Sequence, residues 1–99
     1  LKLPIIIGRD KEANFITNWR FNTVSRKHAE IFEEKEVIKI KDLKSKIGTI
    51  IIRGNESIVV KTKGIELQNK DVILLSDGVR LTILFEKQGI LSRIKSWFT

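Results

Sequence analysis

Residues 37–52 read VIKIKDLKSKIGTIII and place two β-branched apolar runs on either side of a polar, cationic turn. Val and Ile favour strands, and Gly48 supplies a backbone conformation that other residues resist. We therefore predict a strand, a turn and a second strand. Ile47 does not fit a solvated turn, because an exposed β-branched side chain gains nothing there. Either another part of the protein buries it, or it has replaced a residue with a different role.

The same rhythm continues along most of the chain. Further β-branched and aromatic runs lie at residues 3–8, 14–21, 28–32, 48–52, 57–60, 71–75 and 79–85. Turn signals separate them at residues 33–35, 54–55, 63–64, 69–70 and 77–78. Short strands at this spacing predict an all-β fold, a β-sandwich of two sheets. In residues 14–21 the aromatic side chains alternate with polar ones, and we expect the aromatic face to point inward.

Length and composition limit the classes of protein. Ninety-nine residues suit one domain with its own core. The chain has no cysteine and one histidine, so we expect no disulfide, no metal site and no cofactor. It begins at Leu1 and contains no methionine, and we expect it to be a piece of a longer protein.

The charge balance indicates what the chain binds. Nineteen Lys and Arg against twelve Asp and Glu give a net charge of +7, which favours anionic partners. No apolar run reaches the length of a membrane span, and the first residues lack a signal-peptide pattern. We expect a cytoplasmic module.

The last residues follow a different pattern. In GILSRIKSWFT, residues 90, 91, 94, 97 and 98 are apolar, a spacing typical of a helix. We predict a sandwich domain over residues 1–88 and a short amphipathic C-terminal helix over residues 89–99, packed on or next to the domain. The alternative is a basic amphipathic segment for a partner or a lipid surface.

Three polar clusters follow or precede predicted strands: Gly8-Arg9, then SRKH at 25–28, then DLKSKIGT at 42–49. In order and spacing they resemble the signature of the forkhead-associated (FHA) domain, a sandwich of two β-sheets whose loops at one end bind phosphothreonine peptides. Leu67, Asp71 and Ile73 are similar to a later part of that pattern, with Lys70 in place of a glycine. The resemblance covers most of residues 3–86.

The resemblance implies a phosphate- and peptide-binding set. A guanidinium, a hydroxyl donor and further cations suit a phosphate dianion, because charge-assisted hydrogen bonds are short and strong. The set implied here is Arg9, Ser25, Arg26, Lys46 and Ile47. Lys46 stands where the family often has Ser or Thr, and Ile47 replaces the asparagine whose amide binds the peptide main chain.

A second set is implied to support the binding loops: Gly8, His28, Asp42, Ser45, Gly48 and Thr49. Short polar side chains satisfy backbone groups in turns. Ser25 and His28 also suggest a nucleophile and base. On an extended chain, however, residues three apart face opposite sides, and no acidic residue is placed to orient the histidine. We therefore predict no enzymatic activity.

Selectivity for residues beyond the phosphothreonine comes from neighbouring loops in the FHA family. The candidates here are Asn22, Thr23, Ser76, Asp77, Gly78 and Val79, with Arg80 adding charge. The sequence does not specify which flanking residue they would contact.

The predicted function is phosphothreonine-dependent protein interaction in a serine/threonine kinase pathway. One alternative is a phospho-independent scaffold that uses the FHA fold to bind a folded partner. A second alternative, nucleic-acid binding through the basic charge, is disfavoured because the aromatic residues and the basic loops are separate in the sequence.

Overall fold

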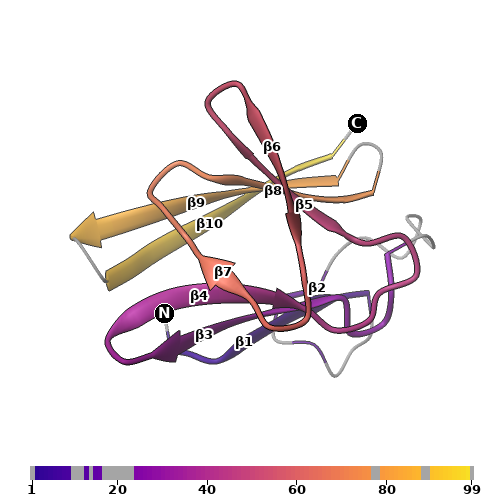
Figure 1. Cartoon of the computed structure of the whole chain (residues 1–99), viewed down its shortest axis with the longest axis horizontal. Coiled ribbons are helices and arrows are strands. Elements are labelled where there is room, and N and C mark those ends of the chain that lie inside the picture. Colours follow the sequence, from indigo (N-terminus) through magenta and orange to yellow (C-terminus); the bar gives the residue numbers. More distant parts are fainter. Residues whose placement is uncertain are drawn as a thin grey trace.

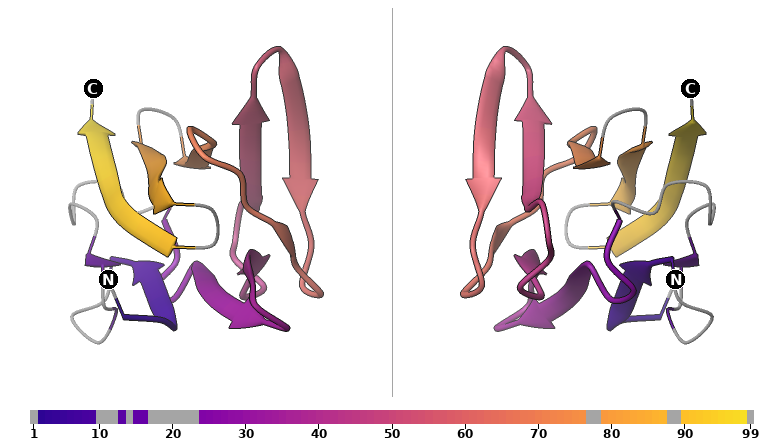
Figure 2. Two further views of the ribbon diagram at one scale, coloured as in Figure 1. Left: turned by 90° about the vertical axis from the view of Figure 1, so that its left-hand side faces the viewer. Right: turned by 90° about the vertical axis from the view of Figure 1, so that its right-hand side faces the viewer.

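The computed structural model describes residues 2–9, 13, 15–16, 24–76, 79–87 and 90–98. Within these ranges the chain forms ten strands in two five-stranded sheets, and no described residue lies in a helix. The predicted all-β fold of two sheets is confirmed. The two sheets face each other as a β-sandwich (Figures 1 and 2). The chain crosses from the first sheet to the second between β4 and β5.

The first sheet has the order β2-β1-β3-β4-β7. Its strands are β1 (Ile5–Gly8), β2 (Phe15–Ile16), β3 (Ala29–Glu34), β4 (Val37–Asp42) and β7 (Ile65–Glu66). All neighbours pair antiparallel except β1 and β2, which are parallel. Two of these strands differ from the prediction. Only two residues of the predicted run 14–21 form β2 within the described part, and β7 is too short to give a sequence signal.

The second sheet has the order β10-β9-β8-β5-β6 and is antiparallel throughout. Its strands are β5 (Thr49–Arg53), β6 (Glu56–Val60), β8 (Val72–Ser76), β9 (Val79–Lys87) and β10 (Ile90–Phe98). The strand β6 therefore lies at the open edge of the sheet, and β10 lies at the other edge.

The core fills the space between the two sheets. Alternating residues of the central strands point inward, as the period of two in a strand requires. Ile31 and Ile40 are paired across β3 and β4, and Ile51 and Ile73 across β5 and β8, and all four are fully buried. Burying a side chain of this size contributes about 1.5 to 3 kcal/mol, so these residues hold the two sheets together.

The predicted C-terminal helix is wrong, because residues Ile90–Phe98 form strand β10, paired with β9. The register shifts between Ile90 and Leu91 and again between Leu91 and Arg93, the mark of a β-bulge. An extra residue in a strand moves later side chains to the other face. Leu91 and Ile94, three residues apart, therefore both contact the core, and this spacing imitates a helix.

One ion pair, between a partly exposed arginine and a buried carboxylate, ties three elements of the sandwich together. Arg53 at the end of β5 donates from Nε to Asp71 Oδ1 (2.9 Å) and from Nη2 to Asp71 Oδ2 (2.8 Å). The same Nη2 donates to the carbonyl oxygen of Glu66 in β7 (3.0 Å). Asp71 is 1% exposed and also accepts from the N–H of Gln68, so its charge is fully compensated. Asp71 thus positions the turn before β8.

Lys70, which replaces a glycine of the FHA pattern, has a φ of 71°. This left-handed conformation costs a residue with a Cβ about 1 kcal/mol, whereas glycine adopts it freely. We expect Lys70→Gly to raise the free energy of unfolding by about 0.5 to 1 kcal/mol, measured by urea denaturation. Lys63→Gly is the matched control: Lys63 is also exposed in a turn, but its φ is not positive, so this change should lower stability. Equal effects of the two substitutions would contradict the explanation.

Candidate functional site

Three loop segments meet at the end of the sandwich where β1 ends and β3 begins. The N–H of His28 donates to the carbonyl oxygen of Ile7 (2.8 Å), and that of Arg9 donates to Ser25 (3.3 Å). The N–H of Leu43 donates to the carbonyl oxygen of His28 (2.9 Å). The three polar clusters of the sequence therefore lie side by side in space.

Gly8 allows the first two segments to approach this closely. A Cβ placed on Gly8 would lie 1.9 Å from the carbonyl oxygen of Arg26, closer than atoms can approach. The neighbour is backbone, which cannot rotate away as a side chain can. Gly8 is thus required by contact with residues 25–26 and not by its own conformation.

One hydrogen bond to the backbone orients the side chain of Arg9. Its Nε donates to the carbonyl oxygen of Val24 (2.7 Å), which fixes the plane of the guanidinium. Among the described residues none accepts a hydrogen bond from its terminal Nη atoms. Their N–H groups are available to a ligand in the forked geometry that suits a phosphate. The sequence did not predict the contact with Val24, because any residue can supply a carbonyl oxygen.

Ser25 and Lys46 meet through the backbone of the third segment. The N–H of Lys46 donates to Ser25 Oγ (2.8 Å). The oxygen of the hydroxyl group is thus held as an acceptor, and its own proton finds no acceptor among the described residues. A half-buried hydroxyl in this state can donate to an anion. The Lys46 side chain is exposed, as is that of Arg26.

His28 joins two of the segments through its buried ring. Its Nδ1 accepts from the N–H of Ser25 (3.0 Å), and its Nε2 lies 2.7 Å from the carbonyl oxygen of Gly48. A carbonyl oxygen only accepts, so we assign the proton to Nε2. Burial lowers the pKa of His28 below 6.5, and the hydrogen bond to Gly48 and the nearby Asp42 offset this only in part. The ring is therefore neutral at pH 7.

The expectation that Ser25 and His28 face opposite sides is wrong, but the two residues still do not form a catalytic pair. Residues 25–28 form a bend and not an extended strand, so the ring of His28 does reach Ser25. It contacts the backbone N–H of Ser25, however, while Ser25 Oγ is bonded to the N–H of Lys46. Both ring nitrogens are in use, and neither can take the hydroxyl proton as a general base must.

Asp42 organises the third segment from within. Its Oδ1 accepts from the hydroxyl groups of Ser45 and Thr49, and its Oδ2 accepts from the N–H of Ser45 (3.0 Å). Ser45 Oγ in turn accepts from the N–H of Gly48, whose φ is 92°. Burial alone raises the pKa of Asp42, but the hydrogen bonds from Ser45 and Thr49 outweigh it and lower the pKa below 3.8. The carboxylate is charged at pH 7 and holds the loop in one shape.

Ile47 lies on the surface of this loop and is 51% exposed. No other part of the described chain buries Ile47. Of the two explanations for this residue, replacement of a residue with a different role is therefore the one that remains. Ile47 follows Lys46, whose N–H donates to Ser25 Oγ, so an exposed apolar residue is next in sequence to the contact between two of the segments.

Only two of the six residues expected to give selectivity lie in the described part of the chain. Asn22, Thr23, Asp77 and Gly78 lie outside the described residues, and Ser76 is the last residue of β8. The expectation that Val79 contacts a ligand is wrong, because its side chain is fully buried in the core. Arg80 beside it is exposed.

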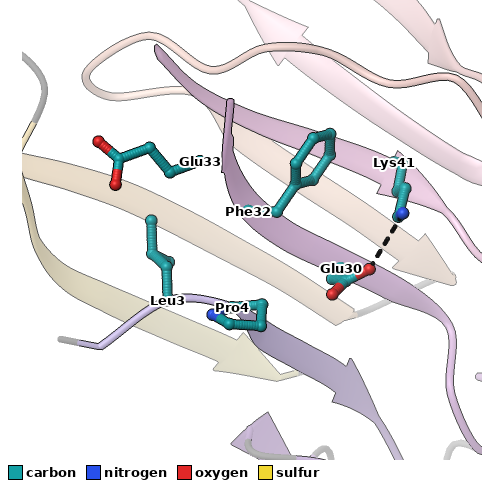
Figure 3. Close-up of a pocket in the computed structure, with 6 residues that line it drawn as sticks. All are labelled: Leu3, Pro4, Glu30, Phe32, Glu33 and Lys41. Atoms are coloured by element: carbon teal, nitrogen blue, oxygen red, sulfur yellow. Dashed lines mark ion pairs between the residues drawn. The ribbon is translucent and has the colours of Figure 1, made fainter. Parts of the chain in front are cut away.

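A hollow of about 430 Å³ lies against β3, β4 and the residues that precede β1. It is lined by Leu3, Pro4, Glu30, Phe32, Glu33 and Lys41 (Figure 3). Lys41 Nζ lies 3.3 Å from Glu30 Oε1 and 5.0 Å from the centre of the Phe32 ring. The cation and the carboxylate neutralise each other. We therefore place the candidate site at the three loop segments.

Residues 24–76 and the other described parts contain no group of three or more His, Asp or Glu side chains arranged as metal ligands. The same parts contain no helix long and apolar enough to cross a membrane.

Comparisons with known proteins identify the family. The FHA domain model matches residues 5–76, and the chain therefore belongs to the FHA domain family. The match covers all three loop segments and the strands between them. No curated protein matches the chain.

Solved structures of FHA domains are similar to it. The FhaA FHA domain, solved in complex with the intracellular domain of Rv3910, has 32% identity and a TM-score of 0.61, over 76% of this chain and 77% of that one. An FHA domain solved in a study of phosphothreonine-dependent FHA interactions has 33% identity and a TM-score of 0.61, over 76% and 70%. The FHA-2 domain of the Mycobacterium tuberculosis ABC transporter Rv1747 has 22% identity and a TM-score of 0.64, over 91% and 72%, and shares the fold.

The neutral state of His28 predicts how stability depends on pH. The unfolded chain, with a histidine pKa of about 6.5, binds more protons than the folded chain at any pH between the two pKa values. The contribution of His28 is thus complete above pH 6.5 and is lost as the pH falls. We expect the free energy of unfolding to decrease from pH 7.5 to pH 5.5, by at most about 1.4 kcal/mol per pH unit.

Urea denaturation of the wild type and of His28→Gln checks this pH dependence. Because His28 is the single histidine of the chain, the variant should lose the slope in this range. If the variant does not fold, an NMR titration of the wild-type ring gives the pKa directly. A pKa at or above 6.5 in the folded protein would contradict the assignment.

Proposed function

We propose that this FHA domain binds a phosphorylated threonine of a protein partner and performs no chemistry itself. The observation that carries the proposal is the state of two donors in the candidate site. Arg9 is held through its Nε and Ser25 through its Oγ. No described residue accepts a hydrogen bond from the terminal N–H groups of Arg9 or from the hydroxyl proton of Ser25. The similar FHA domain from the study of phosphothreonine-dependent interactions supports the choice of ligand.

The surrounding charge favours the same ligand. Arg26, Lys44 and Lys46 are all exposed on the loops around Ser25, and the chain as a whole carries +7. Such charges attract an anionic ligand and speed its association. A serine/threonine kinase acting on the partner would supply the phosphate.

Titration with peptide pools tests the proposal. One pool has a fixed phosphothreonine between degenerate positions, and the other has threonine instead. We expect the wild type to bind the phosphorylated pool at least tenfold more tightly, and Arg9→Ala to lose most of this difference, because a charge-assisted hydrogen bond contributes about 1.5 to 3 kcal/mol.

Lys2→Ala is the control for the Arg9 substitution. It also removes one positive charge, but from an exposed residue just before β1, at the opposite end of that strand from Arg9. This variant should bind both pools as the wild type does. Equal binding of the two pools by the wild type and by Arg9→Ala would instead support a phospho-independent scaffold.

Ile47 lowers the affinity expected for a generic phosphopeptide. The FHA pattern has an asparagine here, and an aliphatic side chain cannot form its hydrogen bonds to the peptide main chain. We expect Ile47→Asn to bind the phosphorylated pool about fivefold or more tightly, since one or two hydrogen bonds contribute about 1 to 3 kcal/mol. Fluorescence anisotropy with the labelled pool measures this change, and Ile47→Ala shows the effect of removing the side chain alone. Binding by Ile47→Asn that is no tighter than by Ile47→Ala would contradict the expectation.

A further inference from the structure

Strand β6 is a sheet edge that lacks the features by which proteins keep edges from pairing. An open edge presents unpaired N–H and C=O groups, and very short strands, bulges, proline or lysine protect it. The other edge strands of the described part have such protection: β2 and β7 have two residues each, and β10 has a bulge and contains Arg93 and Lys95. β6 has five residues in unbroken register with β5, no proline and no lysine, and its one charged residue, Glu56, lies beside the turn. Figure 2 shows β6 on the outer side of its hairpin, with no further strand beyond it.

The backbone groups of Ser57 and Val59 point away from β5. The two-residue turn at 54–55 joins β5 and β6, and the residues on either side of such a turn, Arg53 and Glu56, form a hydrogen-bonded pair. Bonded and non-bonded pairs alternate in an antiparallel ladder, so Ser57 and Val59 take no part in the bonds to β5. Their N–H and C=O groups therefore face outward, and no residue in the described part of the chain pairs with them.

The open part of this edge has an end on each side. Beyond Val59, the carbonyl oxygen of Lys61 already accepts from the N–H of Asp42 (3.2 Å), and before Ser57 the strand ends at the turn. The free groups of Ser57 and Val59 therefore lie symmetrically about Ile58. A strand that pairs here needs only three residues with the opposite direction and the same spacing.

A second β6 meets this requirement. In an antiparallel pair centred on Ile58, Ser57 of each copy lies opposite Val59 of the other, and all the outward groups of both residues find partners. The partly buried side chain of Ile58 then contacts Ile58 of the second copy across the two-fold axis. Val59, which is 64% exposed, is covered in part by the added strand.

We propose that β6 pairs antiparallel with β6 of a second copy of this chain, which joins the two second sheets into one sheet of ten strands. An interface of two short edges is small, so the dimer is weak and depends on concentration. The inference does not rest on the proposed function. Because Lys61, at the end of β6, is bonded to Asp42, antiparallel pairing puts the two loop sites at opposite ends of the paired strands.

The order already present in β6 favours a second copy over a flexible partner segment. A flexible segment loses backbone freedom at every residue that pairs, whereas β6 is held in its hairpin before the copies meet. The net charge of +7 on each copy opposes the dimer. Salt screens this repulsion over about 8 Å at physiological ionic strength, so the dimer should tighten as salt is added.

Sedimentation equilibrium of the chain, from about 10 µM to about 1 mM, tests the proposal. We expect the mean mass to rise toward twice that of the monomer, and the dimer to tighten at least about threefold from 0.05 M to 0.5 M NaCl. Val59→Lys puts like charges close together across the axis and should weaken the dimer at least about tenfold. Val59→Pro removes an outward N–H and should weaken it to a similar extent.

Thr82→Lys is the matched control. It adds the same charge to the chain, but on β9, three strands away from β6 in the same sheet. This variant should dimerise within about twofold of the wild type, since it changes the net charge and not the edge. Thermal unfolding shows that each variant is folded.

Amide hydrogen exchange of the wild type gives a readout that needs no variant. The N–H groups of Ser57 and Val59 should exchange fast in dilute solution and at least about threefold more slowly near 1 mM. The N–H of Ile58, which is paired with β5, should be protected at both concentrations.

Four outcomes would overturn the proposal. They are a monomer at every concentration and salt, a dimer that Val59→Lys leaves intact, a dimer that Thr82→Lys weakens as much as Val59→Lys does, and exchange at Ser57 and Val59 that does not depend on concentration. A dimer that weakens with added salt would also contradict it, because attraction between opposite charges and not edge pairing would then hold the copies together. None of these results bears on the titrations that test phosphothreonine binding.

Discussion

The imidazole of His28 holds together the two loops on which the site depends. One ring nitrogen accepts from the backbone of Ser25, and the other faces the carbonyl oxygen of Gly48 at the crossing from the first sheet to the second. This arrangement requires a neutral ring, and burial lowers the pKa of His28 in that direction. The position of Lys46 against Ser25, and the exposure of Ile47, follow from the placement of these loops.

The hydrogen bonds that hold the loops do not use the terminal N–H groups of Arg9 or the hydroxyl proton of Ser25 as donors to any described residue. The backbone, the ring of His28 and the carboxylate of Asp42 form most of the hydrogen bonds that hold the loops. Among the described residues, none accepts a hydrogen bond from the terminal N–H groups of Arg9 or from the hydroxyl proton of Ser25. A ligand that binds a loop already held in place does not pay the entropy of ordering it.

Two departures from the FHA pattern have different physical consequences. Lys70 keeps the left-handed backbone of the glycine that it replaces, so its effect is on stability. Ile47 leaves the loop conformation to Gly48 and Asp42 and changes only the exposed surface. The first departure costs conformational energy inside the domain. The second places an exposed apolar side chain where the FHA pattern has a polar one.

Local sequence patterns were sufficient to predict the sandwich, whereas the loop residues were singled out by the resemblance to the FHA pattern. Alternating β-branched residues such as Ile38 and Ile40 predict a strand with one buried face, because successive side chains point in opposite directions. Arg9, Ser25 and Asp42 were singled out because the three polar clusters that contain them resemble the FHA pattern in order and spacing. The hydrogen-bond partners of Arg9 and Ser25 could not be predicted, because the carbonyl oxygen of Val24 and the N–H of Lys46 are backbone groups that every residue has.

Tertiary structure decided the features that depend on pairing with distant strands. The apolar spacing at residues 90–98 fits a helix equally well, and only pairing with β9 and its bulge makes that segment a strand. Val79 stands beside a turn in the sequence, but β9 directs its side chain into the core. By itself the sequence determined a two-sheet FHA fold and the chemical groups at its loops. Which of these groups remain free for a ligand was decided in three dimensions, because burial and hydrogen bonding depend on neighbours that are far apart in the chain.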